Sequence, residues 1–248
     1  MRLSEHINSG QARPRRVLMV AANPGLATNT GWPVGFWASE LTHPWLAFTE
    51  AGYEVVICSP LGGRLELDAM SDPRHESGYS ADDLVSLGFL NSPRHAGLLE
   101  STPRLADCPA AGFDALVICG GQAPMFHYRG DEHLKSSVAA FFESGKVVAA
   151  LCHGVSALID VQLSDGSWLI AGKTMTGFSN VEEDFVDTLV GMKVMPWRIE
   201  DAARERGANY VGGGLWRAFA VRDGRLVTGQ QQYSGRKTAE LVMEVLGR

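Results

Sequence analysis

The stretch VVAALCHGVSAL, residues 147–158, contains the strongest structural signal in the chain. Its first five residues are apolar and rich in valine, which is typical of a parallel strand buried on both faces. Small residues stand two positions before and two after Cys152, at Ala150 and Gly154. This spacing is typical of a nucleophile elbow, where a strand turns so sharply into a helix that larger side chains would collide with neighbouring backbone. We predict a strand over 147–151, a tight turn at Cys152 and a helix over 156–163.

Composition and charge favour one soluble globular domain. The 248 residues are 45% hydrophobic and 20% charged, with a formal net charge of −6. We expect a flexible N-terminus over 1–15 and a single domain over 16–248, because a chain of this length can form one enlarged domain. The negative charge argues against a nucleic-acid partner, which would require a clustered basic face.

The chain shows no targeting or disulfide signature. Its first residues are polar and lack the apolar segment of a secretory signal, and no apolar run approaches the roughly 18 residues of a membrane span. The four cysteines (Cys58, Cys108, Cys119 and Cys152) have no CxxC spacing, so reduced thiols are the better interpretation. We therefore expect a cytoplasmic protein with no membrane partner.

Other apolar runs alternate with helical patterns. Short β-branched runs occur at 17–22, 53–59 and 115–119, and helical spacing follows at 36–51 and 131–144. This alternation predicts an α/β fold with a mainly parallel sheet and helices on both faces.

Two further segments complete the prediction. The irregular segment 61–111 contains helical patterns at 81–89 and 96–100, and we interpret it as an insertion packed over the sheet. Near the C-terminus, Asp223-Gly224 separates two β-type runs, 218–222 and 225–228, which predicts a β-hairpin. Residues 238–246 predict a closing amphipathic helix.

Cys152 is the candidate nucleophile. A cysteine on an apolar strand more often packs as a small hydrophobe, but the elbow spacing and the adjacent His153 favour a reactive thiol. The positive end of the following helix should lower its pKa and stabilise a thiolate. All seven histidines lie at or before position 153. This excludes the glutamine amidotransferase arrangement, whose base is a histidine downstream of the cysteine, so the base is His153 or a group upstream.

The chain resembles the ThiJ/PfpI superfamily and, within it, the branch of heat-shock chaperones and glutathione-independent glyoxalases (glyoxalase III). The likeness extends from about residue 16 to 246. The segments that carry it are GFWASELTHPW (35–45), SPLGGRLELDAMSDP (59–73), DALVICGGQAPMF (114–126), ALCHGVSALID (150–160), GKTMTGFSNVEE (172–183) and DGRLVTGQQQYSG (223–235). The resemblance implies a flavodoxin-like sandwich, no cofactor and a homodimer.

The resemblance also implies roles for two acids. It places Glu40, on the first helix, against Cys152, where a raised pKa would let the carboxyl group hold and return a proton. It matches Glu183 with a third triad member that orients His153. Because other acids flank Glu183, a charged helix start is the alternative interpretation.

The turn after the third strand is expected to bind the substrate oxygen. Amides of Gly120-Gly121, with that of His153, could form an oxyanion hole. The family usually has Gly-Gly-His-Gly here, whereas this chain has Gly120-Gly121-Gln122-Ala123. Gln122 can donate and accept hydrogen bonds but carries no charge, which leaves the substrate open. The expected oxyanion and substrate-binding residues are Gly121, Gln122, Trp37 and Phe178.

Metal and dinucleotide sites are not expected. Glu40 and His43 have the i, i+3 spacing of di-iron bundle ligands, but the second copy that such a site needs is missing. His127 and His133 are too isolated to form a zinc site. The glycine run 212–214 is not followed by a helix, so it is interpreted as a turn beside Trp216 rather than a dinucleotide fingerprint.

The function implied is a cysteine-dependent glyoxalase that converts a 2-oxoaldehyde such as methylglyoxal to a 2-hydroxy acid such as lactate. Alternatives within the superfamily are isocyanide hydratase and deglycase activities on other small electrophiles. A holdase chaperone is the alternative from another class, with apolar surface around Phe36, Trp37 and 61–111 and with Cys152 as a redox sensor. A peptidase has little support, because nothing suggests an extended substrate groove.

Overall fold

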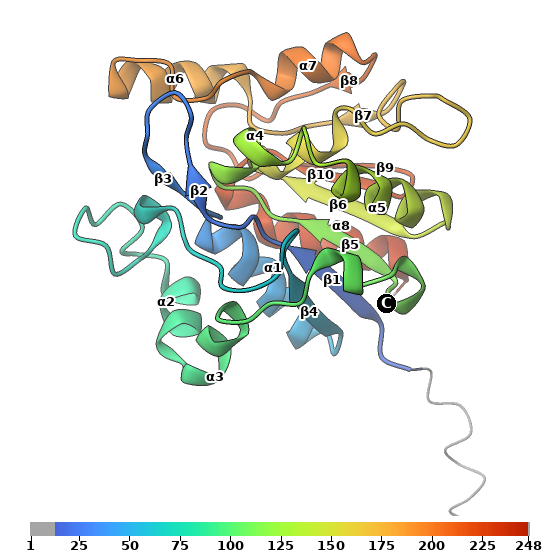
Figure 1. Cartoon of the computed structure of the whole chain (residues 1–248), viewed down its shortest axis with the longest axis horizontal. Coiled ribbons are helices and arrows are strands. Elements are labelled where there is room, and N and C mark those ends of the chain that lie inside the picture. Colours follow the sequence, from blue (N-terminus) through green and yellow to red (C-terminus); the bar gives the residue numbers. More distant parts are fainter. Residues whose placement is uncertain (1–12, 248) are drawn as a thin grey trace, which may run out of the picture.

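The computed structural model describes residues 13–247, and a six-stranded sheet forms its centre (Figure 1). The strand order is β4–β1–β5–β6–β10–β9, with β9 antiparallel to β10 and the other neighbours parallel. Residues 1–12, where a flexible N-terminus is expected, lie outside the described part of the chain. The sheet strands are β1 (Arg16–Val20), β4 (Glu54–Cys58), β5 (Ala115–Ile118), β6 (Val147–Leu151), β9 (Ala220–Asp223) and β10 (Leu226–Gly229). Short paired strands outside it are β2 (Gly25–Leu26), β3 (Pro33–Val34), β7 (Thr174–Met175) and β8 (Asn209–Tyr210).

The predicted strands are confirmed. The strand predicted over 147–151 coincides with β6. The strands predicted over 17–22, 53–59 and 115–119 correspond to β1, β4 and β5, and their ends differ by one or two residues. Every residue of β5 and β6 is buried, as a strand covered on both faces requires. The C-terminal hairpin is also confirmed, but its turn is formed by Gly224 and Arg225, one residue later than predicted, because Asp223 still pairs with Leu226.

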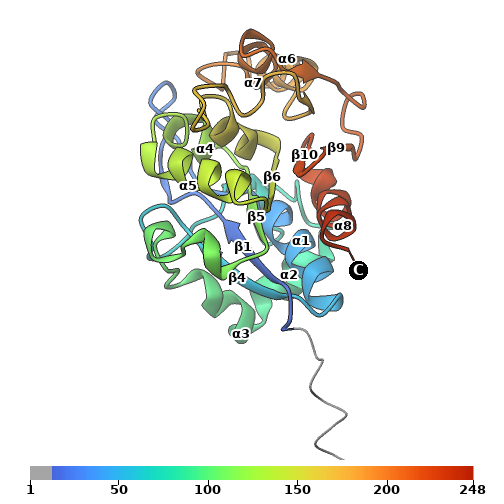
Figure 2. The same cartoon turned by 90° about the vertical axis from the view of Figure 1, so that its right-hand side faces the viewer.

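Helices cover both faces of the sheet (Figures 1 and 2). Successive residues of β1 point to opposite sides, so Met19 joins the core under α1 and α8 while Leu18 joins the core under α5. The α-helices are α1 (Ala38–Glu50), α2 (Leu84–Asn91), α3 (Pro93–Ala96), α4 (Ala123–His127), α5 (Glu132–Glu143), α6 (Asn180–Val190), α7 (Ile199–Glu205) and α8 (Gly235–Leu246). The 3₁₀ helices are η2 (Ala69–Ser71), η3 (Gly97–Leu99), η4 (Leu105–Asp107), η5 (Ala110–Gly112), η6 (Cys152–Leu158) and η7 (Gln232–Ser234).

The predicted insertion and a second set of helices lie at opposite ends of the molecule in both views. Segment 61–111, with α2 and α3, forms the lower end, and α6 with α7 forms the upper end (Figures 1 and 2). The backbone amide of Phe36 donates to Glu66, which ties the insertion to the segment before α1. None of the helices in the described chain is both long enough and apolar enough to cross a membrane.

The helix after the elbow differs from the prediction. It is the 3₁₀ helix η6, which begins at Cys152 and not at residue 156, and all seven of its residues are buried. Gly154 packs so closely on β5 that a Cβ atom there would lie 2.6 Å from the carbonyl oxygen of Ile118. A fully buried segment has no polar face, so its sequence lacks the amphipathic period that marks a helix start.

Helix α6 was not predicted, although its ends carry recognisable signals. Ser179 and Glu182 form a reciprocal capping box at its start. Gly191 ends it in the left-handed conformation, with φ of 79°. The acids at its start were instead interpreted only as a triad candidate or a charged helix start.

Candidate active site

Cys152 stands at the point where β6 turns into η6. Its backbone φ is 54°, in the left-handed region that non-glycine residues rarely adopt. Its neighbour Gly154 allows this turn by packing directly against the backbone of β5. A strained non-glycine residue held this way is characteristic of functional sites. The turn leaves the thiol at the carboxyl ends of the parallel strands, where open α/β sheets place their sites.

Glu40, in the first turn of α1, is completely buried beside this thiol. Its Oε2 atom accepts a hydrogen bond of 2.8 Å from the amide of Gly120. Burial raises the pKa of Glu40 to about 8, while hydrogen bonds from Cys152 and Gly120 act in the opposite direction. The carboxyl group therefore carries a proton at neutral pH and can exchange it with the thiol.

The expectation of a lowered Cys152 pKa is wrong for the free protein. Burial raises the pKa of this thiol well above its usual value, and the charge of Glu40 raises it further. The amide of His153, which donates to the sulfur, lowers it only in part. The sequence indicated a helix start but not the complete enclosure of the sulfur, which penalises the thiolate.

His153 connects the thiol to an acid on α6. Its Nδ1 atom lies 3.9 Å from Cys152 Sγ, and its Nε2 atom lies 3.0 Å from Glu183 Oε1. The ring of Phe178 packs against the imidazole, with centroids 4.3 Å apart. The carboxylate of Glu183 orients the ring so that Nε2 carries the hydrogen and the free Nδ1 faces the sulfur.

Asp68 is a buried site residue that the sequence analysis missed. Its two carboxylate oxygens accept the amides of Gly35, at 2.8 Å, and of Gln122, at 2.6 Å. Burial raises the pKa of Asp68 to about 6, although these hydrogen bonds act against the shift. The residue ties the turn after β5 to the segment before α1, and nothing local in LELDAMSDP indicates this role.

The hydrogen bonds of this turn correct the expected oxyanion hole. The amide of Gly120 is committed to Glu40, because a buried carboxyl group needs a donor. The amide of Gln122 is committed to Asp68. Between them, Gly121 has φ of 107° and lines the cavity, and no acceptor for its amide occurs among residues 13–247.

A cavity of about 140 Å³ opens above Cys152. The four expected substrate-binding residues all line it, together with His153 and Glu183. The lining residues that the sequence did not reveal are Met70, Tyr79, Phe185, Val186, Leu189, Val190, Val194, Met195, Trp216 and Gln232. The walls are therefore mainly apolar, and the polar groups gather around the sulfur.

Trp216 is held over this cavity by a buried carboxylate. Its backbone φ is 54°, and its amide donates to Glu182 Oε1 at 3.2 Å. The same oxygen accepts 2.8 Å from the side-chain amide of Gln230, which also binds Gly213 and Gly214. The expected turn over 212–214 is thus part of the site, and the glycine run beside a tryptophan was its only sequence signal.

Comparison with known proteins agrees with this geometry. Residues 34–245 match the family model described as the DJ-1/PfpI family. The chain belongs to the DJ-1/PfpI family. This confirms the resemblance drawn from the sequence, because the match covers most of the region that carries it.

Two curated relatives and one solved structure similar to this DJ-1/PfpI protein are named as glyoxalases. It is 31% identical to glyoxalase 3 of Candida albicans over 86% of this chain and 90% of that protein. It is 27% identical to the glutathione-independent glyoxalase HSP31 of Saccharomyces cerevisiae over 94% of this chain and 98% of the other. The crystal structure of glyoxalase III from C. albicans superposes with a TM-score of 0.78 at 26% identity, covering 93% and 97% of the two chains.

One further expectation is corrected in this family member, and one pair of residues noted in the sequence is placed. Phe36 is completely buried, so it cannot contribute to an exposed chaperone surface. It lies against the sheet because the segment before α1 must pass under the insertion. The i, i+3 pair does not converge, since Glu40 binds Gly120 whereas His43 binds Asp83 on α2 at 2.7 Å.

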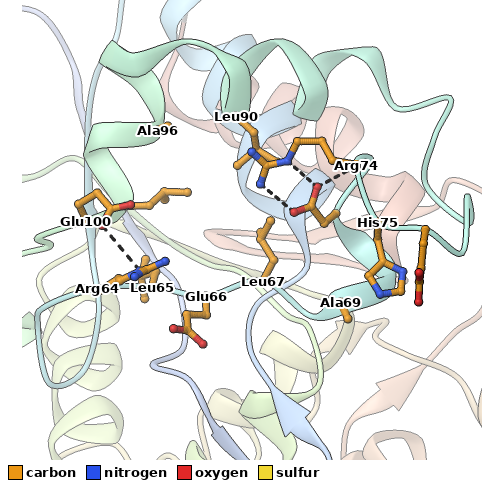
Figure 3. A pocket seen from close by; sticks show the side chains of 13 residues that line it. Arg64, Leu65, Glu66, Leu67, Ala69, Arg74, His75, Leu90, Ala96 and Glu100 are labelled. Carbon is orange, nitrogen blue, oxygen red and sulfur yellow. Dashed lines mark hydrogen bonds and ion pairs between the residues drawn. The ribbon is translucent and has the colours of Figure 1, made fainter.

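A larger hollow, of about 850 Å³, lies in the insertion and holds no comparable chemistry (Figure 3). Arg74 makes two hydrogen bonds to the carboxylate of Asp72. Arg64 faces Glu100 at 3.7 Å, and both side chains are exposed to solvent. Each arginine that lines this hollow thus already faces an acid, and the reactive groups lie in the smaller cavity.

Proposed function

We propose that this DJ-1/PfpI protein is a glutathione-independent glyoxalase that converts a 2-oxoaldehyde to a 2-hydroxy acid without a cofactor. The observation that carries the proposal is the convergence of Glu40 and His153 on Cys152, which lines a small, mainly apolar cavity. The names of its relatives support the same reaction.

The first step requires a nucleophilic sulfur. The reacting form is the one in which the Glu40–Cys152 pair has lost one of its two protons. Ionised Glu40 takes the thiol proton as Sγ bonds to the aldehyde carbon, and Glu40 then gives this proton to the resulting oxygen. The product is a hemithioacetal. A carboxyl group with a pKa near 8 exchanges a proton efficiently at cellular pH. The Gly121 amide is the backbone donor available to the substrate oxygen.

The second step moves a proton between adjacent carbons. His153 removes the hydrogen from the former aldehyde carbon through Nδ1, which gives an enediol, and a proton returns to the second carbon. Glu183 holds the opposite ring nitrogen at 3.0 Å, so it stabilises the imidazolium during this transfer. The resulting thioester is hydrolysed by water, which releases the 2-hydroxy acid and regenerates the thiol.

The test is lactate formation from methylglyoxal without glutathione, followed by NMR. Cys152→Ala should abolish the reaction, while Cys108→Ala, a matched change at another cysteine away from the cavity, should retain it. If the wild type forms no 2-hydroxy acid from any 2-oxoaldehyde, the proposal fails. Hydration of an isocyanide in that case would indicate the related hydratase chemistry.

A holdase chaperone is the second candidate, because α6 exposes a row of apolar side chains. Phe185 and Leu189 are 47% and 72% exposed. A holdase of this kind should still suppress aggregation of a heated client after Cys152→Ala. Loss of suppression in Val181→Asp, at a 60% exposed position of α6 that does not line the cavity, with lactate formation retained, would support this second role.

Partners and location follow from the family likeness. We propose a small aldehyde as the ligand, a homodimer as the assembly and the cytoplasm as the compartment. Sedimentation analysis of the purified protein tests the dimer.

A further inference from the structure

We propose that the preferred substrates are 2-oxoaldehydes with an aromatic or large apolar substituent, which packs against Trp216 and the α6 wall of the cavity. This inference rests on the proposed glyoxalase function and specifies its substrate class. An arylglyoxal such as phenylglyoxal represents this class.

The charge of the lining excludes anionic substrates. No lysine or arginine occurs among the cavity-lining residues of the described chain. Besides the thiol and the phenol of Tyr79, the ionisable groups of this lining are His153 and Glu183, and these two are hydrogen-bonded to each other. An anionic oxoaldehyde would therefore lose its hydration without gaining a cationic partner, so a neutral substrate is favoured.

The reactive groups lie at the buried end of the cavity. Cys152, His153 and Gly121 are buried at the inner end, where the dicarbonyl group must lie to react. Helix α6 supplies the outer wall through Phe185 and Leu189, which are largely solvent-exposed. A methyl substituent offers little apolar area to this outer wall, whereas a ring extends toward it. Burial of each additional apolar carbon is favourable, so a ring can raise kcat/KM more than tenfold over a methyl group.

Aromatic side chains form a continuous path along one side of the cavity. Phe178 packs on His153, and its ring centroid is 5.9 Å from that of Trp216. Trp216 in turn contacts Phe185 edge to face, at 5.6 Å. Such edge-to-face arrangements also suit an added aromatic ring. The path leads from the catalytic imidazole to the opening.

The position of Trp216 is imposed by the protein. A left-handed backbone is unfavourable at a residue with a side chain, so surrounding structure must maintain it. Here the fully buried Glu182 does so by accepting the Trp216 amide. The indole is thus preorganised beside the site, which lowers the cost of binding a flat apolar substituent.

The experiment compares kcat/KM for phenylglyoxal and methylglyoxal without glutathione, with Cys152→Ala as the background. The wild type should favour phenylglyoxal at least tenfold. Trp216→Ala should reduce that ratio at least tenfold, and Phe185→Ala, on the exposed side of α6, should reduce it several-fold. Trp168→Ala is the matched control, since Trp168 stacks on Arg206 outside the cavity, and its ratio should equal that of the wild type.

The outcomes separate this inference from the glyoxalase proposal. A wild-type ratio of one or less, or an unchanged ratio in both Trp216→Ala and Phe185→Ala, overturns the substrate class while leaving the reaction intact. If neither aldehyde reacts, the reaction itself fails. The cavity is then tested by calorimetric binding of 2-hydroxyacetophenone and hydroxyacetone to the Cys152→Ala variant. At least tenfold tighter binding of the aromatic ketone supports the apolar site, and equal binding overturns it.

Discussion

Cys152 and Trp216 share a backbone φ of 54° and line the same cavity from segments 64 positions apart in the sequence. Within residues 13–247 they are the non-glycine residues with positive φ. Close packing of Gly154 on β5 maintains the left-handed backbone of Cys152. The buried carboxylate of Glu182 maintains that of Trp216. Backbone strain of this kind costs about 1–3 kcal/mol per residue. It is concentrated at the nucleophile and at the wall that faces it.

Removing the carboxylate of Glu182 should release the Trp216 loop. Glu182 accepts hydrogen bonds from Ser179, Trp216 and Gln230, so Glu182→Ala leaves buried donors without an acceptor. We expect a loss of about 2–3 kcal/mol in the free energy of unfolding, together with a raised KM for aromatic substrates. Urea denaturation and steady-state kinetics measure the two effects. The control is Asp184→Ala, at an exposed position of the same helix, and equal stability of the two variants would contradict the expectation.

The rate should depend on the proton shared by Glu40 and Cys152. Well below pH 8 both groups are protonated, and sulfur attack requires the loss of one proton. We therefore expect kcat/KM to rise by about tenfold per pH unit below pH 8 and to level off above it. Glu40→Gln should abolish the rise of kcat/KM with pH below pH 8, and it should lower kcat/KM by about 10²-fold or more. A profile that is flat from pH 6 to 8 in the wild type would exclude the shared proton.

The same carboxyl group should make stability depend on pH. Its pKa is raised from 4.5 to about 8 in the folded protein, so the folded state binds more protons than the unfolded state between these values. Stability must then fall as pH rises, by up to about 1.4 kcal/mol per pH unit. Asp68, with a pKa of about 6, and Cys108, with a pKa lowered to about 7, also titrate in or near this range. The contribution of Glu40 is therefore the difference in slope between the wild type and Glu40→Gln in chemical denaturation from pH 6.5 to 8. Glu40→Gln should reduce this slope, and identical slopes in the two proteins would refute a buried neutral Glu40.

Glu183 should act by orienting His153. Glu183→Ala removes the partner of His153 Nε2, and we expect kcat to fall about 10²-fold with a smaller change in KM. Glu183→Gln retains a hydrogen-bonding side chain but not the charge, so its activity should lie between those of Glu183→Ala and the wild type. Equal activity of all three proteins would show that the contact is structural.

The elbow should not tolerate a side chain at Gly154. A Cβ atom there would lie 2.6 Å from Ile118 O and 2.7 Å from Cys119 O, both of which are backbone atoms. Gly154→Ala should therefore lower the melting temperature and remove activity. Gly88→Ala is the control, because no atom lies within 4 Å of an added Cβ in that helix, and it should stabilise the protein by about 0.5–1 kcal/mol. Similar melting temperatures for both variants would contradict the packing argument.

Local patterns were sufficient for the framework of the protein. The strand over 147–151, the turn at Cys152 and the hairpin around Asp223-Gly224 depend on residues adjacent in the chain. The positions of the seven histidines, all at or before residue 153, likewise limited the catalytic base to His153 or a group upstream of it. Such features are determined by short-range steric contacts and by burial on both faces, so they can be predicted from the sequence alone.

The environment of the thiol was decided only by tertiary structure. Glu40 approaches Cys152 from α1 and Glu183 approaches His153 from α6, and the family resemblance, not spacing, pointed to both. Asp68 and Trp216 were missed because their partners lie far away in the sequence. The direction of the Cys152 pKa shift was predicted incorrectly for the same reason. The pKa depends on how completely distant segments exclude water from the sulfur, and a local sequence pattern carries no measure of that exclusion.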